Sequence, residues 1–326
     1  ITLLAYKFFQ DSIRITEGKI AAGYLSERGL SEEVISKFGL GYSPRDGKSL
    51  KRHLDFHGVE VDKAVECGVL FRSKDGTVRD FFRGRLMFPI HNRQGRVVGF
   101  GARTLEETMP KYINTPTTPI FNKSMTLYGL HLAKESIRQK SETVIVEGYM
   151  DVIAAHERGF DNVVASMGTS LTSEQVRDLS KISNLHVLAL DSDVAGQEAT
   201  LRSLETSWRI FDRGDSRKPE GLFAREAMQL KIAILPHGKD PDDFIRSGGD
   251  WKDLISNAIP VVEYLISAVS DRFELDSPGS KNKVVETLAP VFRLLDPFDK
   301  DRYLNQLSDK LNSSVTTVRA ALDMWE

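Results

Sequence analysis

The stretch that decides the fold is Thr143-Val144-Ile145-Val146-Glu147-Gly148-Tyr149-Met150-Asp151, an apolar strand pattern that ends in an acid. A second run, Val187-Leu188-Ala189-Leu190-Asp191-Ser192-Asp193, has the same order, and Gly238-Lys239-Asp240-Pro241-Asp242-Asp243 follows the apolar run 231–235. Ligands of open parallel sheets lie outside the carboxyl ends of the strands. The acids are therefore expected to gather at one edge, where hard oxygen ligands suit Mg²⁺ or Mn²⁺ rather than zinc.

The region around these runs alternates strand and helix patterns. Strands are expected at 143–147, 162–166, 186–191 and 230–235, with helices between them. One helix has a capping-box start at Thr172-Ser173-Glu174-Gln175. Strands that alternate with helices predict a parallel sheet with right-handed crossovers, and so an α/β fold.

The flanking regions read differently, and three regions are expected: 1–138, 139–250 and 251–326. In the first, the pattern predicts helices over 11–28 and 31–38, and a hairpin of strands 85–91 and 96–101 around a turn at 92–95. The last region reads as a small helical bundle with breaks at Pro260, Ser277-Pro278-Gly279 and Pro297. The polar segment 212–224 is expected to be an exposed insertion.

The charge of the chain is uneven. Residues 1–140 hold 23 of the 44 Lys and Arg and 15 of the 46 Asp and Glu, net +8, so the remainder carries 21 against 31, net −10. A basic front half suggests a polyanionic partner, and an acidic back half suggests cations. Cys67 is the only cysteine, which excludes intrachain disulfides and a cysteine-rich zinc site within this chain. A single cysteine fits a reducing cytoplasm. The sequence lacks an apolar stretch of membrane-spanning length, and its first residues do not have the pattern of a signal peptide.

The acids have two possible interpretations. Acids at helix N-termini are favoured by the helix dipole alone, which explains Asp242 and Asp243 as well as a metal does. Three acidic groups at neighbouring strand ends are harder to explain in that way, because clustered carboxylates repel one another unless cations neutralise them.

The acidic motifs together resemble those of a known fold. Glu147-Gly148-Tyr149-Met150-Asp151, the acids Asp191 and Asp193, and Gly238-Lys239-Asp240-Pro241-Asp242 resemble the Toprim fold, a Rossmann-like parallel sheet shared by primases, topoisomerases and some nucleases. Further motifs of the basic region occur in order: 24–30, 82–90, 99–103, 110–116 and 127–130. With them, nearly the whole chain resembles the catalytic core of the bacterial DnaG-type replicative primases. The family often has Asp-Gly-Asp where this chain has Asp191-Ser192-Asp193, with the spacing of the acids kept.

The resemblance implies a DNA-dependent RNA polymerase that makes short primers on single-stranded DNA from ribonucleoside triphosphates, with two or more Mg²⁺ or Mn²⁺ ions. It implies Glu147 as the central ligand or general base, with Asp191, Asp193 and Asp240 as ligands and Asp242 as a further candidate. Asp151 would support the ligands without touching the metal. The family's zinc-ribbon domain and helicase-binding domain are expected to lie outside this chain. Alarmone nucleotides of the guanosine tetraphosphate type, which often inhibit the family, are an implied partner.

The basic residues in or beside the matching motifs are expected to take template phosphates and triphosphates, because arginine offers a bidentate fork to phosphate. Phe81, Phe82 and Tyr112 are placed to stack on bases. The alternative is an ordinary solvated face with Phe81 or Phe82 in the core. The candidate nucleotide- and DNA-binding residues are Arg28, Arg83, Arg85, Arg103, Lys111, Tyr112 and Lys123.

Two other classes stay open. A Toprim-type nuclease or topoisomerase fragment would use the same metals for strand cleavage, although a topoisomerase needs a tyrosine nucleophile in a separate module. A scaffold that binds DNA without chemistry would have no use for a repulsive cluster of acids. If the chain is a primase core, it acts in the bacterial cytoplasm at the replication fork.

Overall fold

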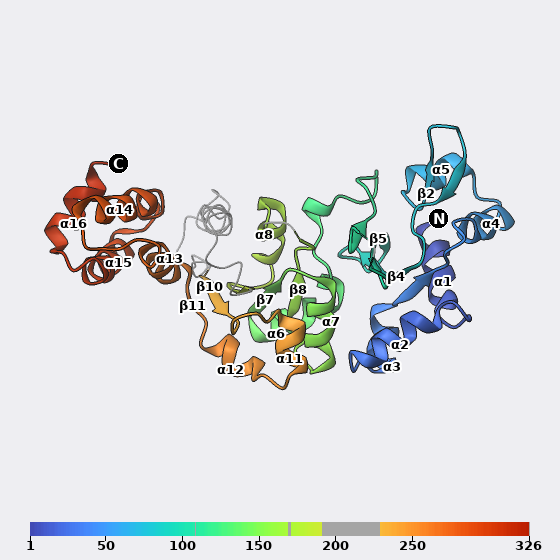
Figure 1. The fold of residues 1–326 in the computed structure, drawn as a ribbon, viewed down its shortest axis with the longest axis horizontal. Helices are drawn as coiled ribbons and strands as arrows, with labels where there is room; N and C mark the ends of the chain where they lie inside the picture. Colours follow the sequence, from blue (N-terminus) through green and yellow to red (C-terminus); the bar gives the residue numbers. More distant parts are fainter. Residues whose placement is uncertain (108, 169–170, 191–228, 326) are drawn as a thin grey trace. The chain divides into compact units, whose positions relative to one another are not determined.

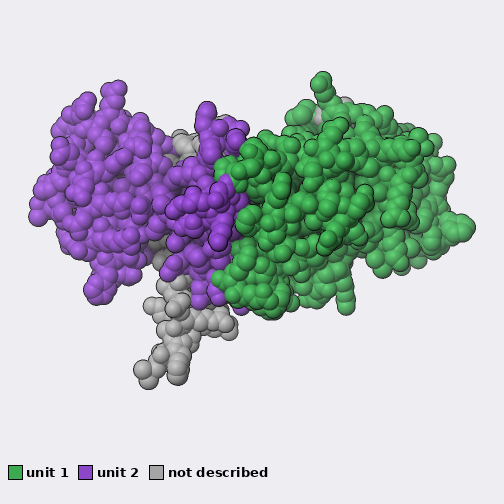
Figure 2. All heavy atoms as spheres, turned by 90° about the horizontal axis from the view of Figure 1, so that it is seen from below, with its two compact units in different colours: residues 1–140, 145–169, 241–249 green, residues 141–144, 170–240, 250–326 purple. Residues whose placement is uncertain are grey.

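The computed structural model describes residues 1–107, 109–168, 171–190 and 229–325, which form two compact units (Figures 1 and 2). The first unit holds residues 1–140, 145–169 and 241–249; the second holds 141–144, 170–240 and 250–326. The acids Asp191 and Asp193 and the expected insertion at 212–224 lie outside the described residues.

The first unit mixes short helices and strands. The hairpin expected near residue 92 is confirmed, because β4 and β5 pair antiparallel on either side of a turn at 92–95. The elements of this unit are α1 (Thr2–Ser12), α2 (Lys19–Glu27), α3 (Glu32–Phe38), β1 (Gly41–Ser43), α4 (Ser49–Phe56), α5 (Val61–Glu66), β2 (Leu70–Arg72), β3 (Val78–Asp80), β4 (Arg85–His91), β5 (Val97–Thr104), β6 (Tyr112–Asn114), the 3₁₀ turn η1 (Lys123–Met125), α6 (Leu130–Lys140), α7 (Tyr149–Glu157), β8 (Val163–Ala165) and α11 (Pro241–Arg246).

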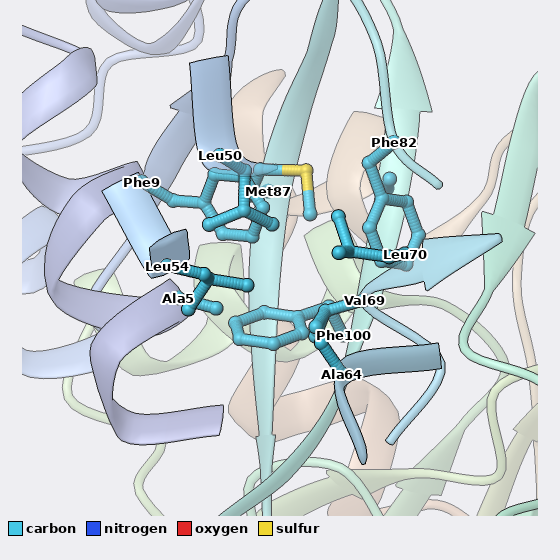
Figure 3. Close-up of a cluster of buried hydrophobic side chains, with 11 residues drawn as sticks. Ala5, Phe9, Leu50, Leu54, Ala64, Val69, Leu70, Phe82, Met87 and Phe100 are labelled. Carbon is cyan, nitrogen blue, oxygen red and sulfur yellow. The ribbon is translucent and has the colours of Figure 1, made fainter. Parts of the chain in front are cut away.

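A four-stranded sheet with the order β1-β4-β5-β6 is the frame of this unit. Its core combines α1, α4, α5 and the sheet, and Figure 3 shows Phe9, Phe82, Met87 and Phe100 meeting there. Phe82 is fully buried in this cluster and Phe81 packs against it, so the base-stacking role considered for Phe82 is wrong. An apolar ring at the centre of the core gains more from burial than it would from an exposed stacking site.

The helix expected over residues 11–28 is also wrong in its first half. The chain leaves α1 at Ser12 and turns before α2 begins at Lys19. The backbone of Gly18 lies against Ser12 and Ile13, where any Cβ would overlap main-chain atoms. A tight return of this kind needs glycine, and a single helical pattern along the sequence does not reveal it.

A five-stranded sheet has the order β11-β10-β9-β7-β8. All four strands expected from the alternating pattern are present within two residues of their expected ends, and β9 and β10 pair parallel in register from Leu185–Gln229 to Leu190–Ile234. The remaining elements are β7 (Glu142–Val146), shared by the two units, and, in the second unit, α8 (Ser173–Leu179), β9 (Leu185–Leu190), β10 (Gln229–Ile234), α12 (Trp251–Ser256), β11 (Ile259–Pro260), α13 (Val261–Ser270), α14 (Pro278–Phe292), α15 (Pro297–Lys310) and α16 (Val315–Asp323).

The helices α13 to α16 pack on one another through buried apolar faces. Their starts lie at the expected breaks: Pro260 is the N-cap of α13, Ser277 that of α14, and Pro297 is the first residue of α15. Proline is suited to the first helical turn because its missing N–H has no partner there anyway. Among the described residues, no helix is both long enough and apolar enough to cross a membrane.

Candidate nucleotide and metal site

The first acidic stretch changes from buried to exposed at a single side chain. Residues 143–146 of β7 are buried, Glu147 is exposed, and Tyr149 to Asp151 at the start of α7 are buried again. Gly148 is the N-cap of α7, and its N–H donates to Asp151 Oδ2 at 2.9 Å. Glu147 thus presents a carboxylate at the carboxyl end of a strand, where α/β sheets bind their ligands.

The third acidic group lies at the start of α11: Asp240 precedes the helix, and Asp242 and Asp243 are in its first turn. Ligand atoms of Asp240, Asp242 and Asp243 all lie within 4.8 Å of one another. Asp240 is exposed, Asp243 is half-buried and Asp242 is 1 % exposed. A set made only of carboxylate oxygens fits a hard divalent cation.

Two arginines hold the Asp242 carboxylate. Its Oδ2 pairs with Nη1 of Arg28, the C-cap residue of α2, and its Oδ1 lies 3.2 Å from Nε of Arg246, one turn further along α11. The backbone N–H of Asp242 donates to Asp151 Oδ1 at 3.2 Å, so Asp151 joins the starts of α7 and α11. Both oxygens of Asp242 already have cationic partners, and Arg28, expected on the nucleic-acid surface, is one of them.

The aromatic side chains around Arg103 form a compact cationic group. The Arg103 guanidinium lies 4.6 Å from the ring centre of Tyr24 and 5.6 Å from that of Tyr112, and its Nη1 donates to the Tyr112 hydroxyl at 3.2 Å. Burial raises the pKa of Tyr112 to about 12, although nearby Arg103 opposes the rise. The Tyr112 hydroxyl is therefore protonated at neutral pH, and the group can bind an anion or a base but does not supply a proton acceptor.

A cavity of about 500 Å³ opens beside this group at the end of β5. Lys111 is exposed and lines it together with Tyr24 and Arg103 on the basic side, and Glu106 and Met109 from the loop after β5 also contribute. Glu107 also lines the hollow, so its two cations are matched by two carboxylates, of which Glu106 is paired with Arg45. With the aromatic ring of Tyr24 and the apolar side chain of Met109, this lining suits a ligand that combines charged groups with a flat apolar part.

The other predicted basic residues are spread more widely. Arg85 donates through Nη1 to the carbonyls of Pro110 and Lys111 at 3.1 and 3.3 Å, which links β4 to the segment just before β6. Arg83 is exposed, with its guanidinium 5.9 Å from the ring centre of Phe71. Burial lowers the pKa of Lys123, which lies in the short turn η1.

The structure therefore brings together two groups of predicted residues within the first unit. One is the Asp151–Asp242–Arg28 network, and the other is the hollow lined by Arg103 and Lys111. Arg246 was missed by the sequence analysis, although its position four residues after Asp242 on a helix could have indicated the pair. The hydrogen bond of the Tyr149 hydroxyl to Asn114 was also missed, and no local signal reveals it.

Comparisons with known proteins agree with these observations. The family model "DNA primase catalytic core, N-terminal domain" matches residues 8–134, "Toprim domain" matches 141–214, and "DnaB-helicase binding domain of primase" matches 262–316. The last match lies within the chain, whereas the sequence analysis expected such a domain only outside it. The sequence of the helices α13 to α16 contains no catalytic or metal-binding motif, so it gave no sign of a partner surface.

Curated DNA primases are similar over most of the chain. The primase of Clostridium acetobutylicum is 37% identical over 293 residues, covering 89% of this chain and 46% of the relative. That of Halalkalibacterium halodurans is 36% identical over 321 residues, covering 97% and 51%. The chain spans about half the length of these curated relatives.

Solved structures show the same likeness in three dimensions. The Escherichia coli primase catalytic core matches with a TM-score of 0.80 at 30% identity, covering 96% of this chain and 98% of that one. A DnaG primase catalytic domain bound to single-stranded DNA matches with a TM-score of 0.79 at 30% identity, covering 94% and 97%. The shared architecture, the ordered motifs and this coverage lead to one conclusion: the chain belongs to the family of DnaG-type DNA primase catalytic cores.

Proposed function

We propose that this chain synthesises short RNA primers on single-stranded DNA from ribonucleoside triphosphates, at the replication fork in the bacterial cytoplasm. The observation that carries the proposal is the exposure pattern at the end of β7. Glu147 is an exposed carboxylate between the buried strand β7 and the buried first residues of α7, in the same unit as the hollow lined by Arg103 and Lys111. A nucleotidyl transfer needs both parts, because carboxylates hold cations at the reacting phosphate and basic side chains hold the rest of the nucleotide.

The donor set fits Mg²⁺ or Mn²⁺. Glu147, Asp191, Asp193 and Asp240 would hold two or more ions, and Asp242 is a further candidate whose carboxylate is held by Arg28 and Arg246. When bound, such ions lower the pKa of the attacking 3′-hydroxyl and stabilise charge on the attacking and leaving oxygens. Only oxygen ligands occur in this set, so we expect no zinc in it.

The chain's own residues orient the substrates. Lys111 and Arg103 would bind the triphosphate or the template backbone, with Tyr112 and Tyr24 beside them to pack on a base. Arg83, Arg85 and Lys123 would extend the cationic surface along the template. Contacts to phosphate carry no sequence information, so binding to single-stranded DNA should be weak, independent of sequence and strongly reduced by salt.

Two more partners follow from the likeness to known primases. The match of residues 262–316 to a DnaB-helicase binding domain supports contact with the replicative helicase through α13 to α15. Alarmone nucleotides carry pyrophosphate groups like those of the substrate, so they would compete for the hollow beside Lys111. Displacement of bound triphosphate by the alarmone measures this directly.

The test is extension of an RNA primer annealed to single-stranded DNA, with labelled ribonucleotides and Mg²⁺ or Mn²⁺. A primed template removes the need for initiation, which other domains of the full-length relatives could support. We expect the wild-type chain to extend the primer and Glu147→Gln to lose at least about 100-fold in rate, because the amide cannot hold a cation as the carboxylate does.

The matched control is Glu33→Gln, the same change at an exposed acid in the first turn of α3, which should leave the rate unaltered. Cutting of the template without extension would replace the proposal by a nuclease. Extension that survives in Glu147→Gln would remove Glu147 from the reaction.

A further inference from the structure

A tyrosine joins the acidic stretch to the basic strand. Tyr149 is the first residue of α7, two positions after Glu147, and its side chain is buried. Its hydroxyl donates to Asn114 Oδ1 at 2.5 Å. Asn114 ends β6, three residues after Lys111. The bond therefore connects the segment that carries Glu147 at the end of β7 with strand β6, which begins directly after Lys111, and all four residues belong to the first unit.

Packing fixes the Tyr149 ring before the hydrogen bond is considered. The ring stacks on Phe88 with centroids 4.9 Å apart and planes 13° apart, and it meets Tyr128 edge-on at 4.7 Å. On β5, Gly101 leaves the space that the ring occupies, since a Cβ there would overlap it. With the ring held in this way, the hydroxyl has one direction in which to point, and Asn114 lies there.

The Tyr149 hydroxyl donates its hydrogen to Asn114, and both the ring and the hydroxyl are buried. The contribution that this arrangement supports is geometric. Every described contact of the hydroxyl and the ring then serves to place the first turn of α7.

The opposite side of that turn is held too. Asp151 accepts from Gly148 N–H with one oxygen and from Asp242 N–H with the other. Glu147 therefore leaves the sheet between two anchors, Tyr149–Asn114 towards the basic strand and Asp151–Asp242 towards α11. An error of about 1 Å in the placement of a reacting group can reduce the rate about 100-fold, so anchors of this kind matter for the chemistry.

We propose that Tyr149 is a positioning residue: its hydrogen bond to Asn114 sets the Glu147 carboxylate at a fixed place relative to Lys111. The inference rests on the proposed function and adds to it a coupling between the two halves of the site. Neither residue touches the reacting atoms. The bond acts by keeping the metal-binding carboxylate and the nucleotide-binding strand in one geometry.

The activity test uses Tyr149→Phe, which keeps the stacked ring and removes only the hydroxyl. The matched control is Tyr128→Phe, because the Tyr128 hydroxyl is equally buried and has no hydrogen-bond partner among the described residues. We expect kcat for primer extension to fall about tenfold in Tyr149→Phe and to stay within about twofold in the control. KM for the triphosphate should change less than about twofold in both, because Lys111 and Arg103 are untouched.

The second readout needs neither metal nor activity. Amide hydrogen exchange of the peptide 145–152, measured with a chelator present, should be about fivefold to tenfold faster in Tyr149→Phe and in Asn114→Ala. Combining the two changes should add little, because both break the same bond. Tyr128→Phe should exchange like the wild-type chain.

The two readouts separate the inference from the function on which it rests. Unaltered exchange in Tyr149→Phe, or an equal change in Tyr128→Phe, would overturn the positioning role whatever the activity. A kcat that does not fall in Tyr149→Phe would overturn it as well. A wild-type chain that makes no RNA, with the expected exchange pattern intact, would instead refute primer synthesis and leave the Tyr149–Asn114 anchor in place.

Discussion

The Asp242 carboxylate should contribute strongly to the local stability of the first unit, and Asp242→Asn tests this with the smallest possible change. The substitution keeps the shape and removes the charge. In the structure this carboxylate is 1 % exposed and faces Arg28 and Arg246, whose side chains are 21% and 35% exposed. The variant leaves two arginines around a neutral amide at the point where α2 meets α11.

The magnitude follows from the exposure of the partners. Removing one partner of a fully buried ion pair costs about 3–5 kcal/mol, because the remaining charge is left without compensation. Here water reaches both arginines and the amide oxygen still accepts a hydrogen bond, so we expect about 2 kcal/mol. That free energy corresponds to roughly 30-fold faster exchange of the amides that open with this contact.

The assay is native-state hydrogen exchange of the peptide 241–249, with a chelator present so that metal binding makes no contribution. The control is Asp243→Asn on the same helix. Asp243 is 48% exposed and pairs with Arg246 at 2.5 Å, and exposed pairs contribute about 0–1 kcal/mol. Its variant should therefore exchange no more than about fivefold faster. Equal exchange in the two variants would refute the reasoning that burial gives Asp242 its weight.

Two further predictions concern packing and pH. Gly101→Ala should lower the free energy of unfolding by about 1–3 kcal/mol, because its Cβ would overlap the Tyr149 ring. Gly23→Ala, in an open position on α2, should raise the free energy of unfolding by up to about 1 kcal/mol. Urea unfolding followed by circular dichroism measures both changes, and changes of the same sign would contradict the packing argument. Burial lowers the pKa of His156 from 6.5 to about 4, so between these pH values the unfolded chain binds a proton at this residue and the folded chain does not. The stability that depends on neutral His156 should be fully present above pH 6.5 and should fall as the pH drops towards 4. The loss for this group is at most about 1.4 kcal/mol per pH unit. Urea midpoints at pH 7.5, 6.0 and 5.0 should therefore decrease in that order, and less steeply in His156→Phe. Burial also lowers the pKa of His131 and His186, so an equal slope in the two proteins would show that His156 does not contribute.

The local sequence determined the elements that present the site. Apolar β-branched runs bounded by acids and glycine produced β7, β9 and β10, and the serine caps and prolines fixed where α3 and α13 to α15 begin. These signals lie within a few residues of the structure they specify, because strand alternation, capping and proline geometry are local effects. The exposed position of Glu147 follows from the same pattern.

Only the tertiary structure decided which distant residues meet. Arg28 pairs with Asp242, 214 positions away in the sequence, and Tyr149 bonds Asn114, 35 positions away. Phe82 lies in the core, which was the alternative interpretation for it, and Arg28, a candidate for the nucleic-acid surface, pairs with Asp242. A buried charge needs a partner and a buried ring needs a matching space, and both are supplied by whichever segments the fold places alongside. The sequence alone determined which side chains could form the site, and the packing of the chain decided which of them are buried in the network around Asp242 and which lie exposed, as Glu147 and Lys111 do.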